Sequence, residues 1–154
     1  MIKVAVMLLS CFLIATAADL PSRKWINLAA IKTMASAAEA EALKRGVQVT
    51  ICIVDESGNL LFLQKADGAG LNTIAFAQKK ARYAALYRRP SKAAADAVAK
   101  GNVATLAFPD VFPNQGGVPI QVDGETIGGI ACSGAASEVD EAISLAAIDA
   151  LLKK

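Results

Sequence analysis

A glycine-interrupted apolar segment, residues 124–135 (GETIGGIACSGA), constrains the fold of this chain more than any other feature. Its apolar content is typical of a buried strand, but four of its twelve residues are glycines. Glycine weakens a strand interior because it supplies no side chain to pack and loses much conformational entropy. The segment therefore predicts a strand whose backbone is kept bare for a bulge, a close neighbour or a ligand.

The other predicted strands occur in pairs that are joined by short turns. The strands are apolar or alternate apolar with polar residues, and the turns carry Asp, Asn and Gly, which is the pattern of β-hairpins. The pairs are residues 47–54 with 60–64 around the turn 55–59, and residues 118–122 with 125–133 around the turn 123–124. A further short strand is predicted near residues 103–106. Strands that arrive in hairpins predict an antiparallel sheet.

Four helices are predicted from the spacing of apolar residues and from cap residues. Pro21 and Ser22 open the first helix, which ends before Gly46. Its apolar stripe consists of Trp25, Leu28, Ile31, Ala35, Ala38 and Ala42. The others are expected from Asn72 or Thr73 to about Tyr87, from Ser91 to about Lys100, and from Glu138 to Leu152 after the cap Ser137. Helices packed on an antiparallel sheet make an α+β domain.

The first 18 residues have the organisation of a secretory signal peptide. Lys3 forms a short basic region, residues 4–14 are apolar apart from Ser10, and residues 15–17 place small side chains where a signal peptidase cleaves. Removal of residues 1–18 leaves one domain, residues 19–154, which is expected to be periplasmic or secreted and not bound to a membrane. The 16 basic residues then become 15, against 14 acidic ones. This near-neutral balance argues against nucleic acid as a partner.

Two cysteines, Cys52 and Cys132, remain in the mature chain, and both fall in predicted strands. In an exported protein they form a disulfide if the two strands are neighbours with suitable geometry. The other interpretation is two buried thiols that act as small apolar side chains, and we favour it.

A series of short motifs in a fixed order resembles one protein family. The motifs are VDESGNL at 54–60, DGA at 67–69, KA at 80–81, PS at 90–91, GGVPI at 116–120, DG at 123–124, IGGI at 127–130 and CSG at 132–134. Over residues 25–151 they resemble the GlcG/HbpS family, which includes the C-terminal domain of PduO. The resemblance implies a profilin-like fold, a five-stranded antiparallel sheet flanked by helices. It also implies homo-oligomers, haem binding by several members, and enzymatic steps on small organic acids for a few.

The chain contains no histidine, which separates it from relatives that ligate haem iron through His. A haem would need Tyr, Met, Cys or a hydroxyl as its axial ligand, or would bind without a protein ligand. The absence of histidine also removes the commonest general base and metal ligand, and no metal site is expected.

Glycines at predicted loops and strand ends form the first candidate site. The glycines are Gly68, Gly70, Gly116, Gly117, Gly128, Gly129 and Gly134. Bare N–H groups near a helix start hold a carboxylate or a phosphate, and the last strand leads toward such a start at residues 133–137. The candidates for the pocket are Gly68, Gly116, Gly117 and Ser133. The structural interpretation is that such glycines serve turns, a bulge and the close approach of a helix or subunit. We favour the structural interpretation.

A helix face with aromatic and basic side chains is the second candidate site. Phe76, Lys80, Tyr83 and Tyr87 share one face of the predicted helix, and this face suits a planar anionic ligand such as haem. The alternatives are a solvated face or packing against another subunit, and they are favoured.

Asp67 is the acid that we single out, because it precedes two glycines and the helix that carries Lys80. Turns also recruit Asp for backbone hydrogen bonds.

Three hypotheses about function follow. The first, which we favour, is an exported homo-oligomeric protein that binds a small anionic or haem-like tetrapyrrole ligand. Its candidate ligand-binding residues are Asp67, Gly68, Lys80, Tyr83, Tyr87, Gly116, Gly117 and Ser133. The second is an enzyme acting on a small organic acid, with Asp67 and Lys80 as the acid–base candidates. The third is a non-catalytic structural or interaction subunit.

Overall fold

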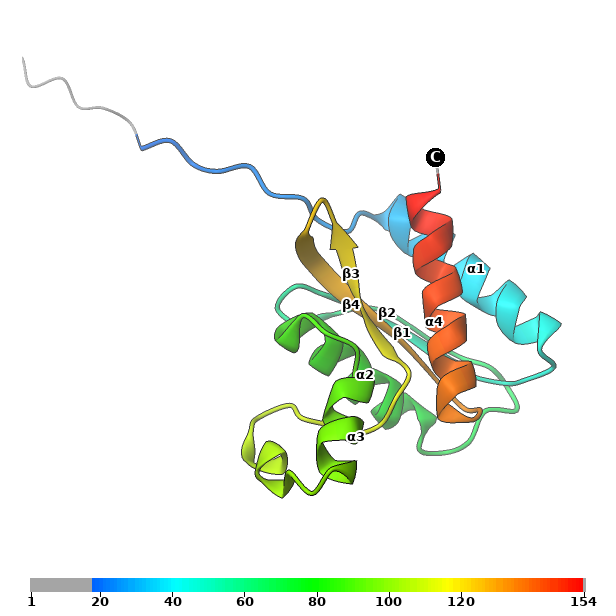
Figure 1. Cartoon of the computed structure of the whole chain (residues 1–154). Coiled ribbons are helices and arrows are strands. Elements are labelled where there is room, and N and C mark those ends of the chain that lie inside the picture. Colours follow the sequence, from blue (N-terminus) through cyan, green and yellow to red (C-terminus); the bar gives the residue numbers. More distant parts are fainter. Residues whose placement is uncertain (1–17, 154) are drawn as a thin grey trace, which may run out of the picture.

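A computed structural model of the chain describes residues 18–153, so nearly all of the predicted signal peptide lies outside the described residues. The elements follow one another as helix, hairpin, two helices, a short 3-10 helix, hairpin and helix (Figure 1). They are α1 (Leu28–Lys44), β1 (Thr50–Asp55), β2 (Leu60–Lys65), α2 (Thr73–Tyr87), α3 (Lys92–Ala99), η1 (Val103–Ala107), β3 (Gly117–Val122), β4 (Glu125–Ser133) and α4 (Ser137–Leu152).

The strands form one antiparallel sheet in the order β2-β1-β4-β3. This confirms the predicted α+β class, but the prediction of five strands is wrong for residues 18–153, which contain four. The segment predicted as an extra strand, near residues 103–106, forms η1 instead. The edge of β3 is closed to a further strand, because Gly117 exchanges hydrogen bonds with Ser91 and Pro119 has no N–H to donate. The profilin-like description stays a prediction.

Helices cover both faces of the sheet (Figure 1). α1 and α4 pack together on one face, where their apolar side chains share a core with Ile53 and Ile130. α2 lies on the other face, where its alanines pack against Cys52, Val54 and Ala131. The molecule therefore has three layers, and α2 is separated from α4 by the sheet.

The bare backbone of β4 lets α2 lie directly on the sheet. A Cβ on Gly129 would come within 3.0 Å of the Ala81 carbonyl oxygen and would lie 3.0 Å from the Ala85 nitrogen, both in the α2 backbone. Gly117 of β3 meets the backbone of Lys80 in the same way. At these two positions the structural interpretation of the glycines is confirmed. The close contact also brings Lys80 to the end of the sheet.

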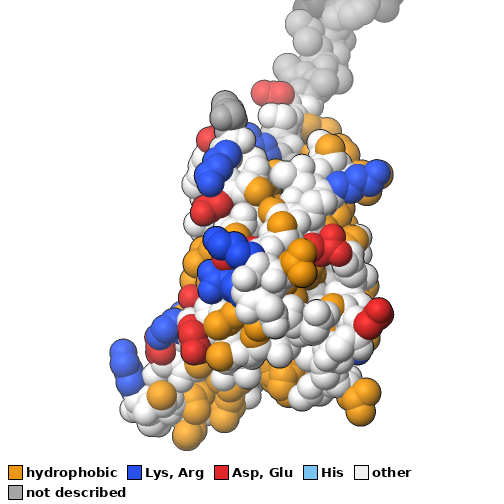
Figure 2. Space-filling model, turned by 90° about the vertical axis from the view of Figure 1, so that its right-hand side faces the viewer, with side chains coloured by type: hydrophobic (Ala, Val, Ile, Leu, Met, Phe, Trp, Pro, Cys, Tyr) orange, Lys and Arg blue, Asp and Glu red, His pale blue; other side chains and the backbone are white. Residues whose placement is uncertain are grey.

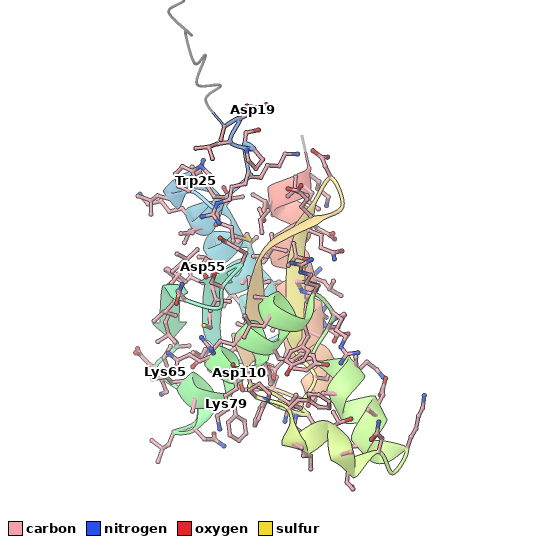
Figure 3. The ribbon with its side chains drawn as sticks, turned by 90° about the vertical axis from the view of Figure 1, so that its left-hand side faces the viewer. Asp19, Trp25, Asp55, Lys65, Lys79 and Asp110 are labelled. Atoms are coloured by element: carbon pink, nitrogen blue, oxygen red, sulfur yellow. The ribbon has the colours of Figure 1, made fainter. Side chains whose placement is uncertain are left out.

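The first helix begins later than predicted. α1 starts at Leu28 after the cap Asn27, whose Oδ1 accepts a 2.8 Å hydrogen bond from the backbone N–H three residues on. The prediction of Ser22 as the cap is therefore wrong. Trp25 lies before the helix, 68% exposed, at the upper end of the molecule in Figure 3. Asn and Ser are equally good caps, and burial of Ile26 next to Asn27 favours the later start.

Cys52 and Cys132 lie on neighbouring strands but on opposite faces of the sheet. In the pairing of β1 with β4, Cys132 is opposite Ile51, whereas Cys52 is opposite Ala131. Both cysteines are free and buried, which confirms the interpretation as two thiols. Burial raises the pKa of each thiol to about 12, so both stay protonated at neutral pH.

We expect neither Cys52 nor Cys132 to react until the domain that contains them unfolds. Modification requires an accessible thiolate, and both burial and the raised pKa oppose it. Labelling by a disulfide reagent such as DTNB should be at least about a hundredfold slower in the folded protein than in denaturant. Rapid labelling of one thiol in the folded protein would contradict this placement of the cysteines.

Within the part of the chain that the structure describes, every helix is too short or too polar to cross a lipid bilayer. On the face seen in Figure 2, Lys and Arg side chains are interspersed with Asp and Glu side chains. This mixing of signs is expected of a surface whose charges nearly balance.

Candidate functional site

A buried ion pair between Lys80 and Asp140 joins the two helix layers at one end of the sheet. Lys80 Nζ of α2 donates to Asp140 Oδ2 of α4 at 2.9 Å and to Cys132 O of β4 at 3.2 Å. The side chains of the pair are 1% and 2% exposed. Asp140 Oδ1 also accepts a hydrogen bond of 3.0 Å from Ala135 N. Charged side chains buried this deeply need such partners, because an unpaired charge costs several kcal/mol in the interior.

A glycine and a serine shape the surroundings of the Lys80 ammonium group. A Cβ on Gly116 would lie 2.9 Å from Lys80 Nζ, so a bare backbone makes room for the ammonium. Ser144 Oγ of α4 accepts from Cys132 N at 2.9 Å and donates to Gly116 O at 2.8 Å. These hydrogen bonds hold the start of β3 and the end of β4 against α4.

Lys80 and Asp140 contribute to the wall of a cavity of about 270 Å³, which we name the Lys80 cavity. The wall combines the start of α2, the loop before β3, the end of β4 and the start of α4. Its residues are Gly70, Asn72, Thr73, Phe76, Lys80, Asn114, Ser133, Gly134, Ala135, Ser137 and Asp140. The wall is rich in hydroxyl and amide groups, and its volume is close to the lower limit for small-molecule pockets. The cavity therefore suits a small molecule or one polar end of a larger one.

The Lys80 cavity lies at the N-termini of two helices, α2 and α4. Neither helix has a side-chain hydrogen bond at its cap, although the first N–H groups of a helix have no partner within it. A helix N-terminus attracts anions through these donors and through its dipole. Because the charges of Lys80 and Asp140 balance, the cavity offers hydrogen-bond donors without a net charge. This arrangement can hold a carboxylate.

Residues 26–149 match the family model described as "Haem degrading protein HbpS-like". The chain belongs to the HbpS-like family. The resemblance that the motifs indicated is therefore confirmed, and the Lys80 cavity lies within the residues that carry the match.

This HbpS-like chain is similar to a known protein in sequence and to solved structures in fold. Protein GlcG of Escherichia coli strain K12 is 37% identical over 98 residues, which cover 64% of this chain and 73% of GlcG. The crystal structure of HbpS is 30% identical with a TM-score of 0.80, and the superposition covers 91% of this chain and 99% of that one. The crystal structure of the PduOC:heme complex is 27% identical with a TM-score of 0.76, and covers 82% and 95%.

Four of the residues predicted to bind a ligand come together in this HbpS-like chain. Lys80 and Ser133 line the Lys80 cavity, and Gly116 and Gly117 pack against Lys80 from β3. The signal that found them was the glycine pair beside a predicted strand start and the basic residue within an apolar helix face.

Asp67 and Gly68 lie outside the wall of the Lys80 cavity. Asp67 is exposed in the loop between β2 and α2, and a Cβ on Gly68 would meet the side chain of Gln48. The structure therefore does not bring Asp67 together with Lys80, and the carboxylate beside Lys80 is Asp140 instead.

Tyr83 and Tyr87 are also separate from the Lys80 cavity. Tyr83 is fully buried, and its ring stacks on Tyr87 with 4.7 Å between the ring centroids. The hydroxyl of Tyr83 accepts a 2.8 Å hydrogen bond from Arg89 Nε, and that of Tyr87 donates to Pro109 O at 2.5 Å. Within one chain both phenols are therefore engaged. Neither of the favoured interpretations of this helix face, a solvated face or packing against another subunit, predicted this packing within the chain.

Asp140 is the residue of this site that reasoning from the sequence missed. Ser137-Glu138-Val139-Asp140 has the spacing of a capping box, in which an acid in the first helical turn reaches back to the backbone. The hydrogen bond from Ala135 N to Asp140 Oδ1 is a variant of that contact. The pattern signals a helix start, but it does not reveal a partner 60 residues earlier in the chain.

The acids at the first hairpin serve the turn. Asp55 Oδ1 accepts hydrogen bonds from Ser57 N and Asn59 N at 2.9 and 2.8 Å. Burial alone would raise the pKa of the Asp55 carboxyl, but the hydrogen bonds from Asn59 and Ser57 outweigh it and hold the pKa below its usual value. Among residues 18–153, no three His, Cys, Asp or Glu side chains gather as a metal site.

Proposed function

We propose that this HbpS-like chain is an exported, homo-oligomeric binding protein for a small anionic or haem-like ligand, whose carboxylate occupies the Lys80 cavity. One observation carries the proposal: a buried, fixed lysine lies in a polar cavity at two helix N-termini without side-chain caps. The family description and the PduOC:heme complex support a haem-like ligand.

The donors around the Lys80 cavity match a carboxylate better than a cation. Lys80 uses two of its three N–H donors on Asp140 and Cys132. The hydroxyls of Ser133 and Ser137 and the amide of Asn114 line the same space. A carboxylate accepts hydrogen bonds from such groups without requiring another buried cation.

The residues fit the carboxylates of a haem better than its iron. Tyr83, Met34, Cys52 and Cys132 are each 0% exposed, and the raised pKa of the thiols disfavours the thiolate that iron binds. The hydroxyl of Tyr87 already donates to a backbone carbonyl, so the serine and threonine hydroxyls in the wall of the Lys80 cavity are the axial ligands that remain. We therefore infer that a tetrapyrrole would be held mainly through its propionates and its flat apolar face.

Export and assembly belong to the proposal as well. Export rests on the organisation of residues 1–18. Assembly is supported by three exposed apolar side chains that lie close together in the sequence, since exposed apolar patches mark interaction surfaces. They are Val103 and Leu106 of η1 and Phe108 after it.

An enzyme acting on a small organic acid is the second candidate function. The observation that favours it is the 2.9 Å contact between an ammonium and a carboxylate in the wall of a cavity, since such a pair can donate and accept a proton. The pair is Lys80 with Asp140, which replaces Asp67 as the acid of this hypothesis.

Titration of the mature protein with haemin, protoporphyrin IX and glycolate tests the proposed function. If propionates rather than iron hold the ligand, haemin and iron-free protoporphyrin IX should bind with affinities within about threefold of each other. Binding of glycolate alone would restrict the proposal to small acids. Saturable binding of none of the three would overturn the proposal and favour the structural subunit.

A further inference from the structure

A second cavity, of about 430 Å³, lies beside β3 and is separate from the Lys80 cavity. We name it the β3-edge groove. The groove has an apolar wall, which includes Val118 of β3 with Leu145 and Ile148 of α4. Arg88 and Arg89 also line the groove. Its lining contains two arginines and no Asp or Glu, so the groove combines apolar walls with a net positive charge.

Arg89 is held in place by the two stacked tyrosines of α2. Its Nε donates to the hydroxyl of Tyr83 at 2.8 Å, and its guanidinium carbon lies 5.7 Å from the ring centroids of both Tyr83 and Tyr87. Tyr83 is fully buried, so the hydrogen bond anchors the guanidinium to the core. The two terminal nitrogens of a guanidinium form the fork that binds a carboxylate through two parallel hydrogen bonds.

Arg88 has an unusual backbone conformation beside this anchored guanidinium. Its φ is +54°, in the left-handed region that residues other than glycine rarely occupy. Arg88 is the C-cap of α2, and a residue in this conformation is a common way to end a helix. Among residues 18–153, neither Arg88 nor Arg89 forms an ion pair with a carboxylate.

We propose that the β3-edge groove binds an amphipathic carboxylate, with the carboxylate on the arginines and the apolar body along Val118, Leu145 and Ile148. Two features point to this class of ligand. The two arginines of the groove have no counter-ion in the described part of the chain. The apolar wall and these arginines line the same groove. In this account Tyr83 and Tyr87 are positioning residues, which orient Arg89 and do not touch the ligand.

Calorimetric titration with decanoate, at concentrations below micelle formation, tests the proposal. Decyltrimethylammonium carries the same apolar chain with the opposite charge, and acetate carries the same carboxylate without the chain. We expect saturable binding of decanoate and at least about tenfold weaker binding of either control. In NMR spectra, decanoate should shift the amide signals of Val118, Leu145 and Ile148, whereas those of Thr73 and Ser133 in the Lys80 cavity should stay in place.

Substitutions at two positions locate the binding. Arg89→Gln removes the forked donors and should weaken decanoate at least about tenfold. Leu145 is partly exposed, so Leu145→Glu places a carboxylate in the groove with little risk to folding, and Leu145→Gln has nearly the same shape without the charge. The glutamate should weaken decanoate at least about tenfold more than the glutamine does. The proposal would be overturned if the two Leu145 variants bound decanoate equally, or if decanoate and decyltrimethylammonium bound equally. It would also be overturned if decanoate shifted NMR signals only in the Lys80 cavity.

Discussion

Gly129→Ala is expected to destabilise the protein by about 3 kcal/mol or more, because the added methyl group has no space. It would come within 3.0 Å of Ala81 O and would lie 3.0 Å from Ala85 N. Both atoms belong to the α2 backbone, so no side-chain rotation relieves the overlap. α2 would have to move off the sheet and expose the apolar residues beneath it. Chemical denaturation followed by circular dichroism measures the loss.

Gly70→Ala is the matched control for that substitution. A Cβ on Gly70 would make ordinary contacts, at 3.4 Å from Asn72 Oδ1 and 3.5 Å from Thr73 Cγ2. Its effect on stability should be less than about 1 kcal/mol in either direction. Similar stabilities for the two variants would show that β4 does not need its bare backbone for α2.

Lys80→Met is expected to cost about 3–5 kcal/mol, because it leaves the Asp140 carboxylate buried without its counter-ion. Methionine replaces most of the apolar part of the lysine side chain, so the loss reports the charge more than the packing. Asp140→Asn should also be destabilising, since it leaves the buried ammonium without a carboxylate partner. Denaturant unfolding of both single variants measures the two losses.

The double variant Lys80→Met/Asp140→Asn provides the control. Its asparagine retains an oxygen that can accept the hydrogen bond from Ala135 N. With neither charge present, the double variant should lose at least about 1.5 kcal/mol less than the sum of the two single losses. Strict additivity would mean that the two side chains do not act as a pair, and it would contradict the geometry described above.

Local sequence patterns predicted the hairpins and most helix ends, because these features depend on neighbouring residues. Asp123 and Gly124 have φ of +51° and +81°, as the tight turn between β3 and β4 requires. The second helix runs from Thr73 to Tyr87, close to its predicted limits. By contrast, the prediction of a strand near residues 103–106 was wrong. A further strand can pair only with a free sheet edge, and Ser91 already occupies the edge of β3.

The candidate site was predicted only in part, for a related reason. Lys80 and the Gly116-Gly117 pair were found because a basic residue in an apolar helix face and adjacent glycines are local signals. The pairing of Lys80 with Asp140 depends on how α2 and α4 meet at the end of the sheet. Asp67 was favoured because it precedes two glycines and the helix that carries Lys80, and such neighbourhood in the sequence is a poor guide to contacts between layers.

The central claim is that the Lys80 cavity binds the carboxylate of the ligand. The most direct test compares the affinities of Ser137→Asp and Ser137→Asn for protoporphyrin IX. Ser137 lines the Lys80 cavity at the first position of α4, where a negative charge favours the helix, so the aspartate variant should remain folded. If the cavity receives a carboxylate, the aspartate should weaken binding at least about tenfold more than the asparagine does, because like charges repel. Equal affinities in two folded variants would contradict the assignment of the Lys80 cavity as the anion site.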